Sequence, residues 1–283
     1  MSAIPVWLIL AVITGLLSNI YNFINRYLLK DNDDPTVYAW FTELMRFVIF
    51  GAFAIFNWKL IINQQSLLAL IAVGLTEFIG GYFYMKMHSY AHLSISSILT
   101  RTRLIWVPVI SFFLLKEVLH FSDYLGILII FLGVSTVMAP KKLFVDKGAL
   151  YANVSTFFIA FNVVLLKLAV PFASVPVINT FQALPGAVLF PIFMKNSRSR
   201  IKTLTRTNLP LKLFAVLVSV AQLFFFIYAL NFGDASKINA VYQGMLIFGV
   251  LAGIIFLKER KDIGRKLIGA AITIIGVILV GAS

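Results

Sequence analysis

The chain of 283 residues is 60% hydrophobic and 12% charged, with a mean hydropathy of +0.95. A water-soluble protein of this size needs far more surface charge, so the composition indicates a chain embedded in lipid. The net charge of +13 comes from basic residues in short gaps between apolar runs, which is typical of loops that face anionic lipid and argues against nucleic-acid binding. The absence of cysteine excludes disulfides and thiolate metal sites.

Ten apolar runs are long enough to cross a hydrocarbon core of about 30 Å. The first begins close to Met1 without a basic leader or cleavage site, so we predict a span there and not a signal peptide. The connections are too short for a soluble domain, and 196–208 is the longest polar one. The predicted spans are 4–28, 37–57, 66–86, 93–115, 123–140, 148–168, 175–194, 210–231, 236–257 and 263–282.

The distribution of lysine and arginine predicts how the chain is oriented. Most of these residues lie in the connections that follow the first, third, fifth, seventh and ninth spans, or at the helix ends beside them. Cytoplasmic loops carry the excess of positive charge. We therefore expect both termini to face away from the cytoplasm in a multi-pass protein of the plasma or inner membrane.

The second half of the chain repeats the first. Residues 111–117 align with 253–259 at a constant shift of 142 residues, and the same shift brings Ser94 onto Ser236. Apolar helices resemble one another by chance, but chance does not explain a polar Lys-Glu at two helix ends followed by glycines with equal spacing. These glycines are Gly126 and Gly133 in the first half and Gly269 and Gly276 in the second, where they predict close packing of the fifth and tenth spans.

Each repeat holds five spans, which is an odd number, so the second repeat must lie upside down relative to the first. The predicted fold is an all-α polytopic membrane protein with ten transmembrane helices in two inverted five-helix repeats, 1–142 and 143–283. Inverted repeats permit two mirror-related packings, each open to one side of the membrane, with a shared site near the midplane.

The motifs Leu115-Lys116-Glu117 and Leu257-Lys258-Glu259, each followed by a Gly-x6-Gly helix, resemble the EamA-type ten-helix members of the drug/metabolite transporter superfamily. The resemblance implies a central cavity lined mainly by helices 1, 3, 4, 6, 8 and 9, with helices 5 and 10 on the outside. The chain departs from the family pattern at Val250, where a proline is frequent. Further matches are Gly15 to Asn19, Arg46, Gly74 and Pro108.

Five ionisable side chains lie well inside predicted spans, away from the span ends, where charge is costly and marks candidate functional sites. The i,i+3 spacing of Glu43 and Arg46 predicts a structural ion pair on one helix face. Arg101 and Arg103 lie about 200° apart around an α-helix, so we expect one to pair with Glu77 and the other to face the cavity. A free guanidinium there, with Arg101 favoured, suits a carboxylate, phosphate or sulfate.

The second half carries amides and aromatic residues at depth instead of charges. By the repeat shift Gln243 matches Arg101, so the two are expected to face each other across the pseudo-twofold axis. Buried amides also serve as interhelical hydrogen-bond partners, and aromatic side chains as packing, and both alternatives stay open. The other cavity candidates are Asn19, Asn22, Tyr82, Asn162, Gln222, Asn239 and Tyr242.

These features favour a secondary transporter that moves a small polar metabolite, with an anionic one preferred, by alternating access. The sequence lacks a phosphate-binding loop, so a coupled proton or cation, or the solute gradient, supplies the energy. Alternatives are a proton-coupled exporter of amino acids or of cationic or aromatic drugs, and a membrane receptor or assembly subunit. We predict no enzyme activity, cofactor or metal site, and a monomer or homodimer in the bilayer.

Overall fold

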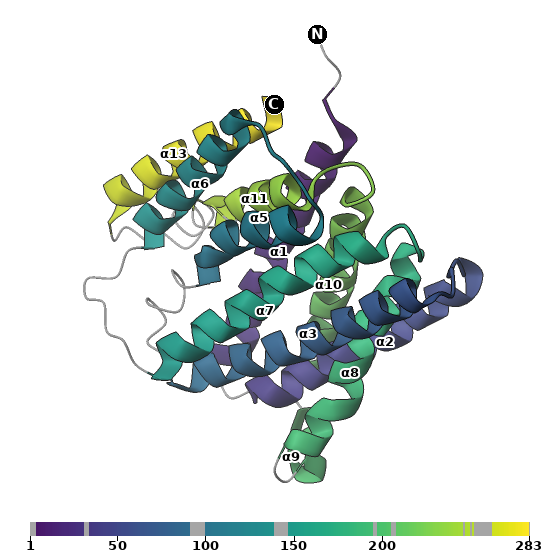
Figure 1. Ribbon diagram of the computed structural model, residues 1–283. Coiled ribbons are helices and arrows are strands. Elements are labelled where there is room, and N and C mark those ends of the chain that lie inside the picture. Colours follow the sequence, from purple (N-terminus) through teal and green to yellow (C-terminus); the bar gives the residue numbers. More distant parts are fainter. Residues whose placement is uncertain are drawn as a thin grey trace.

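A computed structural model describes residues 4–30, 34–90, 100–138, 147–194, 197–204, 208–245, 247–249, 251 and 262–282. Regular structure in these ranges is helical, apart from one isolated bridge between Leu60 and Ala173 (Figure 1). The helices are α1 (Val6–Lys30), α2 (Pro35–Phe56), α3 (Gln64–Tyr90), α5 (Arg103–Leu114), α6 (Phe121–Met138), α7 (Lys147–Ala169), α8 (Val175–Phe193), α9 (Ser197–Leu204), α10 (Leu209–Ala229), α11 (Ala235–Met245) and α13 (Ile263–Ala282), with a 3₁₀ turn, η1 (Thr100–Thr102), before α5.

Seven of the described helices are long and apolar enough to cross a membrane, and α6 is a shorter apolar helix. They correspond to eight of the ten predicted spans. The predicted spans 93–115 and 236–257 are described in part, as η1 with α5 and as α11, and residues 93–99 and 252–257 lie outside the described ranges. The short helix α9 has a basic sequence and lies in the longest polar connection.

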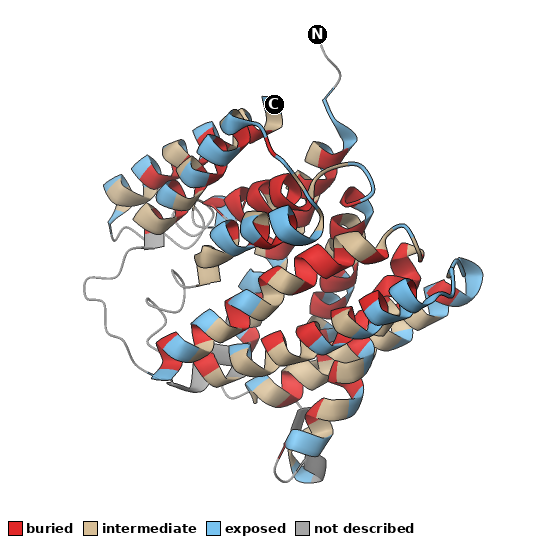
Figure 2. Ribbon diagram, viewed as in Figure 1, coloured by how far each residue is buried: buried red, intermediate tan, exposed pale blue. Residues whose placement is uncertain are grey.

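Burial is distributed as expected for a protein in lipid. Buried residues line the faces where helices meet, and many large apolar side chains on the outward faces are exposed (Figure 2). Phe53, Phe113 and Ile192, for example, are 52%, 73% and 69% exposed. Water would disfavour such a surface, whereas hydrocarbon solvates it.

The glycine pairs of α6 and α13 meet in an antiparallel arrangement. A methyl group placed on Gly126 lies 3.0 Å from the carbonyl oxygen of Gly276, and one placed on Gly133 lies 2.8 Å from that of Gly269. The glycines therefore allow the two backbones to touch, and larger residues do not fit. Because Gly126 matches Gly269 and Gly133 matches Gly276 in the repeat, equivalent helices run in opposite directions.

The other helix contacts show the same symmetry. α3 packs on α7, and α1 packs on α10, which is the equivalent contact when the two repeats are exchanged. The helices α2 and α8, which are equivalent to each other, also pack together, as do α5 and α11. This arrangement is that of two inverted repeats related by a pseudo-twofold axis.

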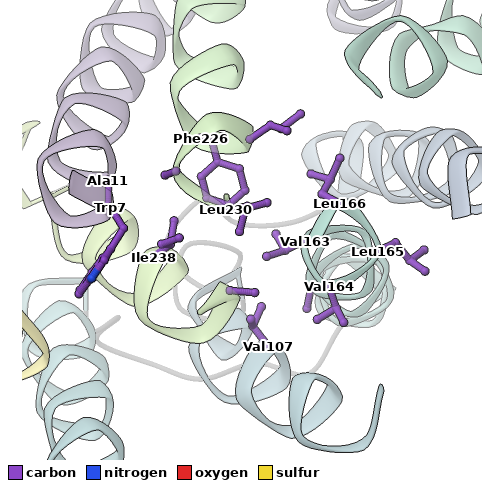
Figure 3. Close-up of a cluster of buried hydrophobic side chains, with 14 of the residues drawn as sticks. Trp7, Ala11, Val107, Val163, Val164, Leu165, Leu166, Phe226, Leu230 and Ile238 are labelled. Carbon is purple, nitrogen blue, oxygen red and sulfur yellow. The ribbon is translucent and has the colours of Figure 1, made fainter. Parts of the chain in front are cut away.

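Both termini lie at the same end of the bundle, which we call the termini end (Figure 1). There, a cluster of buried apolar side chains closes the space between α1, α5, α7, α10 and α11 (Figure 3). Trp7, Val107, Leu166, Phe226 and Ile238 are among its members.

Candidate functional site

Arg101 on η1 contacts Gln243 on α11, and this pair marks the pseudo-twofold axis. Its Nη1 donates a hydrogen bond of 2.5 Å to Oε1 of Gln243, and the two residues are 142 positions apart, which is the repeat shift. Equivalent residues of two repeats can touch each other only at the axis that relates them. The contact therefore marks the position of the pseudo-twofold axis within the bundle.

Arg103 reaches the neighbouring residue of α11. Its guanidinium carbon lies 5.2 Å from the centre of the Tyr242 ring, in cation–π range. The expectation that the two arginines point to opposite sides was wrong. Arg101 belongs to a 3₁₀ turn, in which residues two apart are separated by about 120° the shorter way round, compared with about 160° in an α-helix. Both side chains are long enough to reach α11.

The two arginines have no carboxylate partner within the described parts of the chain. The Nε atoms of Arg101 and Arg103 are buried and make no hydrogen bond. Tyr84 interacts electrostatically with both arginines and with Tyr242 and Tyr21. Unpaired guanidiniums at this depth cost about 2.5–3.5 kcal/mol each on membrane-insertion scales. An anion held between them would offset that cost.

Polar side chains of α1 and α10 surround the same part of α11. The hydroxyl groups of Ser18 and Tyr242 are 3.2 Å apart, and Asn22 donates a hydrogen bond of 3.4 Å to Ser18. Gln222 lies 3.5 Å from the Tyr242 hydroxyl. Asn19 donates to the backbone carbonyl of Met245 at 2.8 Å, so its amide is used to join α1 to α11. Together with the two arginines, these residues form what we call the axial site.

Glu77 lies in a different cluster from the one expected for it. It accepts a hydrogen bond of 3.1 Å from Gln182 on α8, and neither Arg101 nor Arg103 pairs with it. Its electrostatic neighbours are instead Glu43 and Arg46 on α2. The expected Glu77–arginine pair was wrong because the spacing of residues along a helix gives their depth but not the rotation of that helix about its axis.

Glu43 and Arg46 form an ion pair at 2.6 Å, with both side chains largely buried. The Nε of Arg46 also donates to Ser219 on α10 at 2.7 Å. Asn162 on α7 donates to the carbonyl of Val73 and to Thr76 on α3. These contacts tie α2, α3, α7, α8 and α10 together around Glu77, and we call the group the acidic cluster.

Two of the predicted cavity residues, Tyr82 and Asn239, belong neither to the axial site nor to the acidic cluster. Tyr82 packs against Phe78 and Phe193, and the centre of its ring lies 5.6 Å from Nζ of Lys86. Asn239 is fully buried on α11, and neither atom of its amide has a hydrogen-bond partner.

Sequence reasoning overlooked Ser18, Tyr21 and Gln182. Gln182 lies deep in a predicted span, which is the signal that selected Asn162, so the same rule applied evenly identifies it. Ser18 and Tyr21 gave no comparable signal, because hydroxyl-bearing residues are common in transmembrane helices and often bond their own backbone.

Comparison with known proteins decides the family. The model of the EamA-like transporter family matches residues 5–139 and again residues 146–282. The chain belongs to the EamA-like transporter family. It is therefore an integral, multi-pass membrane protein of a family of transporters rather than enzymes.

A solved structure titled "Crystal structure of protein" has the same fold. It shares 13% sequence identity with a TM-score of 0.76, and the match covers 98% of this chain and 99% of the other. No curated protein sequence matches the chain. The comparisons thus establish the EamA family and the fold.

Proposed function

We propose that this EamA-family chain is a secondary transporter of a small polar solute that carries an anionic group. The observation that supports this best is the pair Arg101 and Arg103, which meets α11 on the pseudo-twofold axis without a carboxylate partner in the described residues. Guanidinium forks match the paired oxygens of carboxylate, phosphate and sulfate. Gln243, Tyr242 and the α1 amides supply neutral contacts to the rest of the solute.

Transport in this proposal proceeds by alternating access between the halves 1–142 and 143–283. We infer that the segments 93–115 and 236–257 complete ten spans, and the basic connections favour an orientation with both termini outside. A site on the axis keeps the same contacts available when the two halves exchange conformations. The excess of positive charge at this site disfavours the alternative of a cationic drug, because two unpaired guanidiniums repel it.

Uptake into proteoliposomes tests this proposal. The panel contains phosphate, sulfate, malate and aspartate as anions, with glucose and choline as neutral and cationic comparisons. We expect one or more anions to be taken up, and Arg101→Gln and Arg103→Gln each to weaken that uptake about 10- to 100-fold, since a hydrogen bond to a charged group contributes about 1.5–3 kcal/mol.

Arg200→Gln is the matched control, because it makes the same change in a partly exposed ion pair with Asp34. Folded protein that moves none of the panel contradicts the proposal of anion transport. Anion uptake that survives both axial substitutions shows that the arginines do not bind the solute. Uptake of choline alone identifies a cation transporter instead.

A further inference from the structure

The acidic cluster has one negative charge too many. It contains two carboxylates, Glu43 and Glu77, and one guanidinium, Arg46. Arg46 donates to Glu43 at 2.6 Å and to Ser219 at 2.7 Å. Glu77 is left with a neutral amide donor, Gln182, and with no ion pair among the described residues. A carboxylate inside a membrane bundle needs a compensating positive charge.

The cluster also lacks one hydrogen-bond donor. Gln182 is 4% exposed, and its two N–H groups are used by Glu77 at 3.1 Å and by Asn162 at 3.2 Å. Its amide oxygen is buried and accepts no hydrogen bond from the described residues. Asn162 has no donor left for it, since both of its N–H groups go to Val73 and Thr76. An unsatisfied buried acceptor of this kind is costly and rare in folded proteins.

A single proton on Glu77 corrects both deficits. A neutral carboxyl group has one O–H donor and one carbonyl acceptor, which is the complement of a primary amide. Half of this reciprocal pair is already present as the Gln182 N–H bond to Glu77. The added O–H would donate to the unpartnered oxygen of the same Gln182 amide, and the net charge of the cluster would become zero.

A proton fits this position better than a metal ion. Monovalent and divalent metal ions require several oxygen ligands, and the carboxylate of Glu43 is already held by Arg46. The guanidinium of Arg46 repels a metal ion electrostatically. A proton, in contrast, forms a covalent O–H bond and so leaves no separate positive charge at the carboxyl group. Within the described residues, no group of three or more acidic, histidine or cysteine side chains is arranged to hold a metal.

The acidic cluster and the axial site have electrostatic neighbours in common. Tyr21 on α1 interacts electrostatically with Arg46 and with Tyr84, and Tyr84 interacts with Arg101 and Arg103. An anion bound to the arginines attracts a proton to Glu77, and a proton on Glu77 in turn favours the anion, because such coupling is reciprocal. The sign of this coupling is that of symport.

We propose that Glu77 is the coupling site of the transporter, which binds one proton against Gln182 and carries it in the same direction as the anion at Arg101 and Arg103. The proton site stands on the contacts of the acidic cluster alone, whereas the symport step rests on the proposed function. The two are therefore tested separately.

Infrared difference spectroscopy of the protein in lipid tests the proton site without a solute. Between alkaline and acidic buffer we expect the carbonyl band of a protonated carboxyl group to appear in the native chain and to be lost in Glu77→Gln. Asp262→Asn is the control, because the Asp262 side chain is 41% exposed and lies outside the cluster. The control should retain the band.

Two results contradict this assignment. A band that remains in Glu77→Gln but is lost in Glu43→Gln places the proton on the other carboxylate. A band that appears only when sodium is removed identifies Glu77 as a sodium ligand. Glu77→Gln is close to isosteric, and equal melting temperatures of the variant and the native chain show that loss of the band is not loss of the fold.

Proteoliposomes with phosphate and malate as probes test the coupling. For a probe that the native chain carries, an inward proton gradient should drive accumulation against the anion gradient. Glu77→Gln should lose this accumulation at least about tenfold and keep anion exchange, in which no net proton moves. Accumulation that persists in the variant contradicts symport through Glu77. Absence of exchange in the native chain contradicts the anion-transport proposal instead and leaves the infrared result valid.

Discussion

The two ends of the bundle are held together differently in the residues that the structure describes. At the termini end, apolar packing is combined with buried charged contacts (Figure 3). Lys167 donates to the carbonyl groups of Leu230 and Gly233 at 2.6 and 2.9 Å. Asp123, which is fully buried, pairs with Lys237 at 3.1 Å. The Asp123–Lys237 pair joins the two repeats, whereas the Lys167 contacts lie within the second repeat.

Glu117 adds a helix cap at the same end. Its carboxylate accepts hydrogen bonds from the backbone N–H and the hydroxyl group of Ser236 and from the N–H of Ala235, at the first turn of α11. A negative group at this position also interacts favourably with the dipole of α11. The Lys-Glu end of α5 therefore fixes the start of α11. The equivalent Lys258 and Glu259 lie outside the described residues.

At the opposite end, the described contacts between the repeats include a smaller buried apolar cluster, with Val37 and Phe190 among its members, and the ion pair of Asp34 with Arg200 at 2.5 Å, whose side chains are about one-third exposed. Exposed ion pairs contribute little, whereas buried ones are costly to break. In the described residues, the termini end thus has the larger buried apolar cluster together with the buried ion pair of Asp123 with Lys237. For alternating access, the buried contacts there must open, and their strength sets the free energy of that step.

The largest effect is expected from Asp123→Ala. It leaves the ammonium group of Lys237 buried without this carboxylate, at a cost of about 3–5 kcal/mol to the termini end. Ala11 is fully buried in the apolar cluster, so a cysteine introduced there is shielded while the end stays closed. Since the chain has no cysteine of its own, labelling of Ala11→Cys reports opening directly. We expect labelling to accelerate about 100-fold or more, and an unchanged rate contradicts the comparison.

A smaller effect is expected from Lys167→Met. The change removes two charge-assisted hydrogen bonds to the 230–234 connection, with an expected loss of about 1.5–3 kcal/mol. The same cysteine at position 11 measures it. A labelling rate between that of Asp123→Ala and that of the native chain agrees with the ranking. A labelling rate below that of the native chain contradicts it, because Lys167 would then favour the open end.

Glu117→Gln should weaken the cap by about 1 kcal/mol, because an amide keeps an acceptor but loses the charge. Hydrogen exchange of the backbone amides at residues 235–238 measures this loss. Exchange should become faster there and stay unchanged in α13, which the cap does not touch. If exchange at residues 235–238 is the same in the variant as in the native chain, the Glu117 charge does not stabilise the start of α11.

The smallest effect is expected from Arg200→Gln at the opposite end. The loss of this exposed pair should lower stability by at most about 1 kcal/mol, and salt should remove the difference from the native chain. Melting temperatures at low and high ionic strength check this. A large, salt-independent loss would show that the opposite end is also held by buried interactions.

Much of this arrangement follows from the sequence, because duplication leaves a measurable shift. The shift paired Arg101 with Gln243, and the glycine spacing predicted close packing of α6 and α13 against neighbouring helices, although not that the two contact each other. The rotation of each helix about its axis could not be predicted from the sequence, since apolar residues occupy all faces of a span and leave no amphipathic pattern. For that reason Glu77 was assigned to the arginines instead of to Gln182, and the 3₁₀ turn that redirects Arg101 was not anticipated.

The contact of Arg101 with Gln243 has a consequence for how such a transporter can arise. Two identical five-helix chains that pair in opposite orientations must place the same residue on both sides of their axis. Two arginines would repel each other there, and two glutamines would give no charge for an anion. A single chain that contains both halves is free of this restriction. Gene fusion thus permits an asymmetric binding site at a point of symmetry, where a homodimer cannot form one.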